Sequence, residues 1–431
     1  MLTIYADQIS QRLSYVLTLI FHERNVAYQI VSDHDSFKKA ALPKVAYSDD
    51  SSFEHYPKIY PSTLLFEDKI KKQMVLKSEW MTHEVLSFNG VPDILASIFY
   101  VISLYDDYLQ EEKDHHNRNI GSRSLLYKMN WLEKLMVERW SEQFIDFIEQ
   151  ENGCQLKTQA IPFKIVPTFD IDNTFAYRYK KGGRKFLSIG KDVLKMNLPR
   201  LRERKAVLSG HKKDPYDTFD QIERIARNGF DVKVFWLLGD YGKFDRNLAA
   251  KNLHHQNVIK QTDGFTEVGL HPSYASNESE TVLEKEKHQI EKILVRKVNH
   301  SRQHFLKIDL PTTFERLSNV GFSDDYSLGY ADQLGFRAGI ARPFVWFNLK
   351  ENKVSNLKLH PISYMDGTLN EYMELTIEEA VKTVRNLKKE VKTYGGNFVA
   401  LWHNETIGDY GKWKGWNEVL AETLKTEEID V

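Results

Sequence analysis

Three short, mostly apolar runs in this chain each end in a side chain that can bind a metal or move a proton. Residues 165–169 precede Asp170, residues 267–270 precede His271, and residues 397–402 precede His403. Short apolar runs of this kind predict buried β-strands. The carboxyl ends of parallel strands in an α/β barrel meet on one face, where such folds keep their functional sites. We therefore expect these three side chains to lie close together.

The first run carries a second carboxylate, Asp172, two residues after Asp170. Residues i and i+2 of an extended chain point the same way. One carboxylate can then bind a cation while the other accepts a proton. The alternative is a strand that simply ends in a polar turn, since Asp and Asn favour turns.

The alternation of predicted elements divides the chain into two parts. Residues 2–6, 26–31 and 62–66 predict strands around a helix over 10–24, which indicates a small α/β domain. From residue 160 onward, β-then-α units repeat, which favours a parallel sheet or barrel. One of these helices opens with a capping box, Thr376 and Glu379, and ends before Gly395. The polar break at 151–153 predicts domains over 1–152 and 153–431.

Composition excludes several classes of protein. The net charge of −1 over 431 residues gives no overall attraction to nucleic acid. No apolar run approaches the roughly 18 residues that a membrane span needs, and no glycine-rich loop marks a dinucleotide site. A single cysteine, Cys154, allows no internal disulfide. The first residues lack the basic start and apolar core of a signal peptide, so the expected location is the cytoplasm.

Residues from about 160 to 410 resemble the NodB-homology polysaccharide deacetylases, carbohydrate esterase family 4. The segments that carry the resemblance are 168–172 (TFDID), 269–273 (GLHPS) and 401–404 (LWHN). The N-terminal part resembles a domain of unknown function often found ahead of such deacetylase-like domains. The resemblance implies a distorted (β/α) barrel and a divalent metal cofactor, with zinc as the expected ion.

The resemblance also implies roles for individual residues. Asp170 corresponds to the catalytic base and His403 to the general acid. Arg302, in the segment 301–305, is the candidate that orients the base, and Asp366 is the candidate partner of the acid. Asp172 and His271 correspond to metal ligands. Apart from the resemblance, Arg337 in the segment 335–339, Tyr274 and Trp402 are candidate substrate-binding residues. An ordinary surface ion pair is the alternative for Arg302 and Arg337, and a place in the core is the alternative for the aromatic residues.

One position departs from the family pattern. The family has a second metal-binding histidine four residues after the first, and here that position is Ala275. A catalytic zinc normally has three protein ligands. We predict that His304 supplies the third ligand. Against this, the strand expected over 304–308 would begin at His304, which would place the residue at the opposite end of the sheet from Asp170. Ser273 and Ser276 are weaker alternatives, because a neutral hydroxyl is a poor zinc ligand.

These observations predict a hydrolase that removes an acetyl group from an N-acetylated sugar or polysaccharide. A hydrolase of another C–N amide bond remains open, as does a barrel that binds glycan without catalysis. The N-terminal part is expected to contribute no catalytic group, although it can shape substrate access. Its charged run, 111–118, contains two histidines and predicts a solvated loop more strongly than a metal site.

Overall fold

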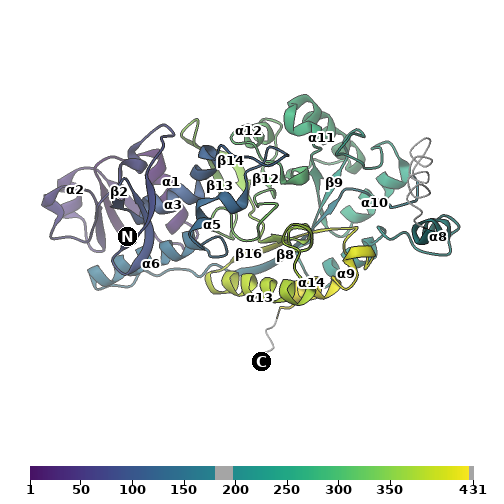
Figure 1. Ribbon diagram of the computed structural model, residues 1–431. Helices are drawn as coiled ribbons and strands as arrows, with labels where there is room; N and C mark the ends of the chain where they lie inside the picture. Colours follow the sequence, from purple (N-terminus) through teal and green to yellow (C-terminus); the bar gives the residue numbers. More distant parts are fainter. Residues whose placement is uncertain (180–197, 427–431) are drawn as a thin grey trace.

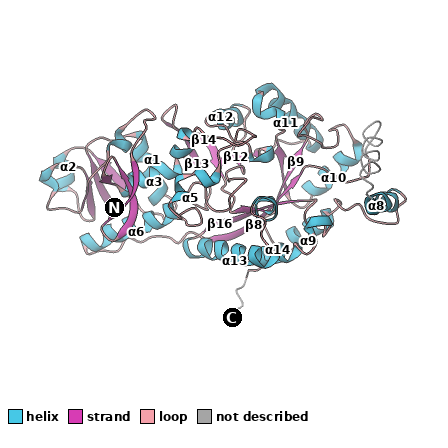
Figure 2. Cartoon of the chain, in the orientation of Figure 1, coloured by secondary structure: helices cyan, strands magenta, loops and turns pink. Residues whose placement is uncertain are grey.

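The computed structural model describes residues 1–179 and 198–426. The N-terminal part lies at one end of the molecule, beside a second part built around a large sheet (Figure 1). Helices and loops surround both sets of strands (Figure 2). Among the described residues, no helix is long and apolar enough to cross a lipid bilayer.

The N-terminal part contains two small sheets. A parallel sheet has the strand order β2-β1-β3-β4, and an antiparallel sheet has the order β5-β6-β7. The elements are β1 (Leu2–Ala6), α1 (Gln11–Phe21), β2 (Tyr28–Val31), α2 (His34–Lys39), β3 (Lys44–Tyr47), β4 (Lys58–Ile59), β5 (Val75–Trp80), β6 (His83–Phe88), β7 (Val91–Pro92), α3 (Ile94–Ile102), α4 (Tyr105–Leu109), α5 (Leu125–Lys128) and α6 (Met136–Asn152).

The strand predicted over 62–66 was wrong. Thr63–Phe66 form a 3-10 turn, and the third strand of the sheet is β3. Leu64 and Leu65 are both fully buried. Consecutive side chains of a strand point to opposite faces, whereas a tight turn can direct two neighbouring leucines into the same core.

The second part is built on a nine-stranded sheet with the order β13-β14-β12-β11-β10-β9-β8-β16-β15. All neighbouring pairs are parallel except β13 and β14. The strands are β8 (Phe163–Ile171), β9 (Lys233–Leu237), β10 (Glu267–His271), β11 (His300–Ser301), β12 (Asp324–Asp325), β13 (Phe344–Asn348), β14 (Lys353–Leu359), β15 (Tyr364–Met365) and β16 (Gly396–His403). The pairing gives one continuous mixed sheet, and its closure into a distorted barrel stays a prediction.

Helices cover the central strands of this sheet, which are buried on both faces, as expected for parallel sheets. α13 packs against β8 and β16, and α10 and α11 pack against β10. The predicted capping box of Thr376 and Glu379 is present at the start of α13, which ends before Gly395. The helices are α8 (Leu198–Leu208), α9 (Phe219–Arg227), α10 (Leu253–Asp263), α11 (Glu280–Leu294), α12 (Thr312–Asn319), α13 (Ile377–Tyr394) and α14 (Asn417–Leu424).

The strand predicted over 304–308 was also wrong. β11 ends at Ser301, and His304–Leu306 form a 3-10 turn directly after it. Phe305 and Leu306 have φ angles of 63° and 51°, outside the range of a strand. His304 therefore lies beyond the carboxyl end of β11, at the same end of the parallel strands as Asp170. This position removes the objection to His304 as a metal ligand.

The two parts share one hydrophobic core and several buried ion pairs. Glu138 of α6 is fully buried between two arginines. Its carboxylate lies 2.6 Å from Nη2 of Arg24 and 2.7 Å from Nε of Arg342, which belongs to the second part. α6 ends at Asn152, where Gly153 adopts a φ of 58° and stops the helix. The predicted boundary thus coincides with a helix end, yet the two parts are tightly packed together.

Candidate metal and acid–base site

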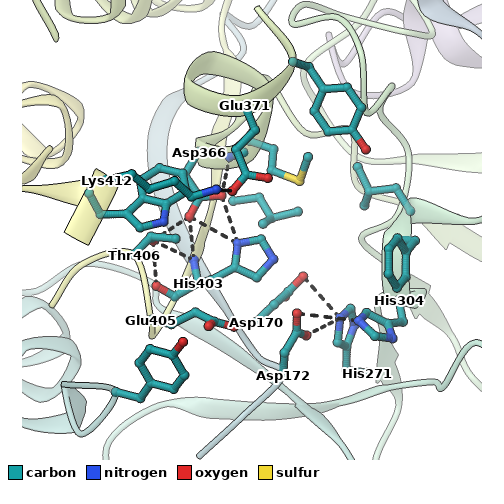
Figure 3. Close-up of a pocket in the computed structure, with 18 of the residues that line it drawn as sticks. Asp170, Asp172, His271, His304, Asp366, Glu371, His403, Glu405, Thr406 and Lys412 are labelled. Carbon is teal, nitrogen blue, oxygen red and sulfur yellow. Dashed lines mark hydrogen bonds and ion pairs between the residues drawn. The ribbon is translucent and has the colours of Figure 1, made fainter. Parts of the chain in front are cut away.

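Strand register brings the predicted residues together. β8 lies between β9 and β16, and Asp170 is directly opposite His403 in the pairing of β8 with β16. His271 ends β10, next to β9. Asp170, Asp172, His271 and His403 all line one cavity of about 440 Å³ at the carboxyl ends of these strands. Figure 3 shows their side chains directed into this cavity.

Asp172, His271 and His304 form a group that could hold a metal ion, with one candidate ligand atom from each lying within 4.8 Å of the others. Nε2 of His271 is 3.3 Å from Oδ1 of Asp172, and Nε2 of His304 is 3.5 Å from Oδ2. Tetrahedral zinc with bonds of about 2.0–2.2 Å separates its ligand atoms by roughly 3.4 Å. The two separations therefore fit a shared cation.

The other nitrogen of each histidine is bonded to an acceptor. Nδ1 of His271 donates to the backbone carbonyl of Arg302, and Nδ1 of His304 donates to Oδ1 of Asp245 at 2.9 Å. These partners can only accept, so in the neutral rings each Nε2 carries the lone pair. Metal-binding histidines are oriented in this way in proteins.

One carboxylate oxygen of Asp172, Oδ1, is buried without a hydrogen-bond donor. It faces Nε2 of His271, which is an acceptor in the neutral ring. Two acceptors so close to each other need a cation or an added proton between them. Two imidazoles and one carboxylate suit zinc, and they also suit Fe(II) and related divalent ions.

Protons can provide that compensation as well as a cation. Burial acts to lower the pKa of His304, but the carboxylates of Asp172 and Asp245 outweigh it and raise the pKa to about 9. Burial acts to raise the pKa of Asp172, but the neighbouring histidines hold it well below its ordinary value. Metal binding would displace the proton from His304, so affinity is expected to rise with pH.

Asp170 is held beside this group by a buried arginine. Nη1 of Arg302 lies 3.0 Å from Oδ1 of Asp170, and its Nε donates to the backbone carbonyl of Tyr326 at 2.9 Å. The guanidinium lies against the ring of Phe235, 4.5 Å from its centre. Oδ2 of Asp170 remains 3.6 Å from Nε2 of His271. Arg302 thus fixes one oxygen of Asp170 and leaves the other toward the candidate metal position.

His403 and Asp366 form a second pair on the opposite side of the cavity (Figure 3). Nδ1 of His403 lies 2.9 Å and 3.1 Å from the two oxygens of Asp366, which is fully buried. Burial acts to lower the pKa of His403, but the carboxylates of Asp366, Asp172 and Asp170 raise it well above its ordinary value. The structure therefore favours a protonated His403, with the proton on Nε2 available to a bound molecule.

The three predicted substrate-binding side chains lie outside the cavity lining. Arg337 is buried, with Nε 2.9 Å from Oδ2 of Asp107. Trp402 is fully buried and donates from Nε1 to the hydroxyl of Tyr364. Tyr274 packs in an aromatic cluster against Phe244 and Phe305. Arg337 and Trp402 are buried against other partners, which corrects the sequence-based interpretation of these two residues. Tyr274 is partly buried beside Phe305 and does not itself line the cavity.

The two weaker candidates for the third ligand are also engaged elsewhere. The Oγ of Ser273 accepts the backbone N–H of Ser276, and the hydroxyl of Ser276 donates to the carbonyl of Ser273. Ala275 begins the 3-10 turn Ala275–Glu278 between them. Both serine hydroxyls thus form hydrogen bonds within this local segment.

Sequence reasoning missed several residues of the site. Asp245, the partner of His304, follows β9 in a loop, so the rule of polar residues after strand ends could have found it. Arg118 comes from the N-terminal part and lines the cavity. It ends the charged run 111–118, for which a solvated loop is expected, yet His116 and Arg118 are both buried. The remaining newly found lining residues with polar or aromatic side chains are Tyr216, Phe305, Glu371, Tyr372, Glu405, Thr406, Tyr410, Lys412 and Trp413.

Comparisons with known proteins cover the chain unevenly. A family of unknown function, DUF7033, matches residues 2–153, which ends one residue beyond the predicted N-terminal domain. No curated protein matches the chain. A crystal structure from Mycobacterium smegmatis, provisionally named a polysaccharide deacetylase, is similar at 15% identity and a TM-score of 0.40, covering 63% of this chain and 89% of that one.

A second solved structure is described as a GH138 enzyme targeting pectin rhamnogalacturonan II. It is 9% identical with a TM-score of 0.26, and the match covers 100% of this chain and 51% of that one. Because both TM-scores are low, the functional conclusion rests on the residues of the cavity.

Proposed function

We propose that this protein is a metal-dependent hydrolase that removes the acetyl group from an N-acetylated sugar or polysaccharide. The observation that carries the proposal is the Asp172–His271–His304 group, whose Nε2 atoms face one carboxylate while their Nδ1 atoms are bonded to acceptors. A buried base candidate and a protonated histidine flank this group in the same cavity.

Amide hydrolysis requires a polarised carbonyl, an activated water and a proton for the departing nitrogen. Asp172, His271 and His304 would hold the metal, which supplies the first requirement and lowers the pKa of water. Asp170 accepts the proton of the attacking water, while Arg302 keeps that carboxylate oriented. His403 donates a proton from Nε2 to the departing nitrogen, and Asp366 keeps the imidazole protonated and in place.

The position of His304 bears on the choice between a catalytic and a purely glycan-binding protein. The absence of a second histidine at Ala275 motivates the non-catalytic alternative. His304 provides a third donor for a zinc ion, the usual number in catalytic zinc sites. This favours the enzyme over the binding protein.

Acetate release tests the proposal. Purified protein is analysed for bound metal and then incubated with a panel of N-acetylated glycans and simple N-acetyl amides. We expect zinc or a related divalent ion at about one per chain and release of acetate from one class of glycan. The variant His271→Ala should lose both metal and activity. A wild-type protein that binds no divalent ion and releases no acetate would contradict the proposal, and cleavage of the simple amides alone would redirect it to another C–N bond.

A further inference from the structure

The turn that carries His304 has an uncommon backbone. Phe305 has φ 63° and ψ 12°, and Leu306 has φ 51°. The left-handed region is sparsely populated by residues other than glycine, and such conformations persist only where surrounding contacts hold them. His304 is directly attached to this turn, so the position of its imidazole depends on those contacts.

The backbone N–H of His304 donates to the carbonyl of Pro272 and that of Leu306 to the carbonyl of Gln303, and a further contact on this turn comes from the N-terminal part. Nη1 of Arg118 donates to the backbone carbonyl of Phe305 at 2.6 Å. Nε donates to Oδ2 of Asp114 at 2.7 Å, and Nη2 donates to the hydroxyl of Tyr372 at 3.1 Å. Arg118 is only 5% exposed. A planar guanidinium can make these contacts in three directions at once, which a lysine ammonium on its flexible stem cannot reproduce.

His116, two residues before Arg118, packs against a neighbour of His304 and a neighbour of Asp245. The ring centre of His116 lies 4.6 Å from that of Phe305 and 5.2 Å from that of Phe244. Phe305 directly follows His304 in the chain, and Phe244 directly precedes Asp245. The imidazole of His116 is therefore packed against the neighbours of the metal-ligand candidate and of its hydrogen-bond partner.

From these contacts we infer that residues 114–118 form a clamp that completes the metal centre, and that Arg118 is a positioning residue for His304. Without the guanidinium, the carbonyl of Phe305 loses its charged donor and the turn relaxes toward ordinary backbone angles. Nε2 of His304 then moves away from Asp172. Within the proposed function, the N-terminal part thus shapes the metal centre without supplying a ligand.

The test is a zinc titration of the full-length chain. Arg118→Met removes the charged donor and keeps a long side chain. Arg139→Met is the matched control, because Arg139 of the N-terminal part also forms an ion pair with the second part, at 2.7 Å from Glu390, and does not line the cavity. We expect zinc affinity to fall by about 10-fold or more in Arg118→Met, as for other residues that orient metal ligands, and to remain at the wild-type value in Arg139→Met.

Equal zinc affinity in wild type, Arg118→Met and Arg139→Met would overturn the inference, as would an equal loss in both variants. If Arg118→Met does not fold, His116→Leu takes its place, with the same expected loss and the same refuting result. The metal centre itself is tested separately: a wild-type protein that binds no zinc refutes the proposed function, whereas tight binding that is indifferent to Arg118 refutes only the clamp.

Discussion

Replacing Asp366 by asparagine should lower the pKa of His403 and move the activity profile with it. The two oxygens of Asp366 accept from Nδ1 of His403 at 2.9 Å and 3.1 Å, from its backbone N–H at 2.9 Å, from the Thr406 hydroxyl at 2.6 Å and from the Gly367 N–H at 2.6 Å. Every partner is a donor. An amide keeps one acceptor oxygen, loses the charge and presents two N–H donors of its own to the remaining donors.

The magnitude follows from the loss of a charged hydrogen bond at a buried site. A hydrogen bond to a charged group contributes about 1.5–3 kcal/mol, and one pKa unit corresponds to about 1.4 kcal/mol. The pKa of His403 is therefore expected to fall by about 1–2 units in Asp366→Asn. Since His403 acts as an acid, the alkaline limb of kcat/KM should move to lower pH by the same amount.

The same pair makes a pH-dependent contribution to stability. A histidine whose pKa is raised on folding stabilises the protein fully below its unfolded pKa of about 6.5, and this contribution is lost as pH rises through the folded pKa. The difference in unfolding free energy between wild type and Asp366→Asn should therefore narrow as pH rises from the folded pKa of His403 in the variant to its higher folded pKa in wild type, leaving the cost of the mispaired amide.

The assay combines two measurements, the pH dependence of acetate release and the NMR titration of the His403 ring in metal-free protein. Glu371→Gln is the control, because it removes a carboxylate from the same cavity that is paired with Lys412 and not with His403. A shift of less than about 0.3 pH units in Asp366→Asn, or an equal shift in Glu371→Gln, would refute the assigned pairing of acid and carboxylate.

Three further variants test other parts of the structure. His304→Ala should lower zinc affinity by about 10-fold or more. His300 lies on β11 outside the cavity and is bonded to Glu267, so His300→Ala should leave zinc affinity unchanged. Unchanged zinc affinity in His304→Ala would exclude His304 as a ligand. Asp170→Asn should retain its metal and lose about 10²–10⁴-fold in kcat, so activity within a few-fold of wild type would rule out its role as base. Glu138→Ala removes the carboxylate between Arg24 and Arg342, and Arg342 keeps a second partner in Glu23. Because buried Arg24 loses its ion pair, the urea-derived unfolding free energy should fall by about 3 kcal/mol. A loss below about 1 kcal/mol would show this buried ion-pair group to be energetically neutral.

Local patterns in the sequence predicted that Asp170, His271 and His403 would lie close together. The apolar runs before Asp170, His271 and His403 predict parallel strands, and parallel strands place their carboxyl ends at one edge. The capping box of Thr376 and Glu379 and the stop before Gly395 predicted α13, because these signals are local. The side-chain types at the strand ends then indicated metal and proton chemistry.

The other features of the site depend on contacts between segments that are far apart in the chain. His304 could be suggested as a ligand, but only the left-handed turn after β11 explains how it reaches Asp172. The sequence offered Arg337 and Trp402 as substrate-binding candidates. In the structure, both side chains bind buried partners from distant segments. Arg118 lies 187 residues from the carbonyl that it binds. Such contacts depend on packing between elements far apart in the chain, and no local pattern of residues encodes them.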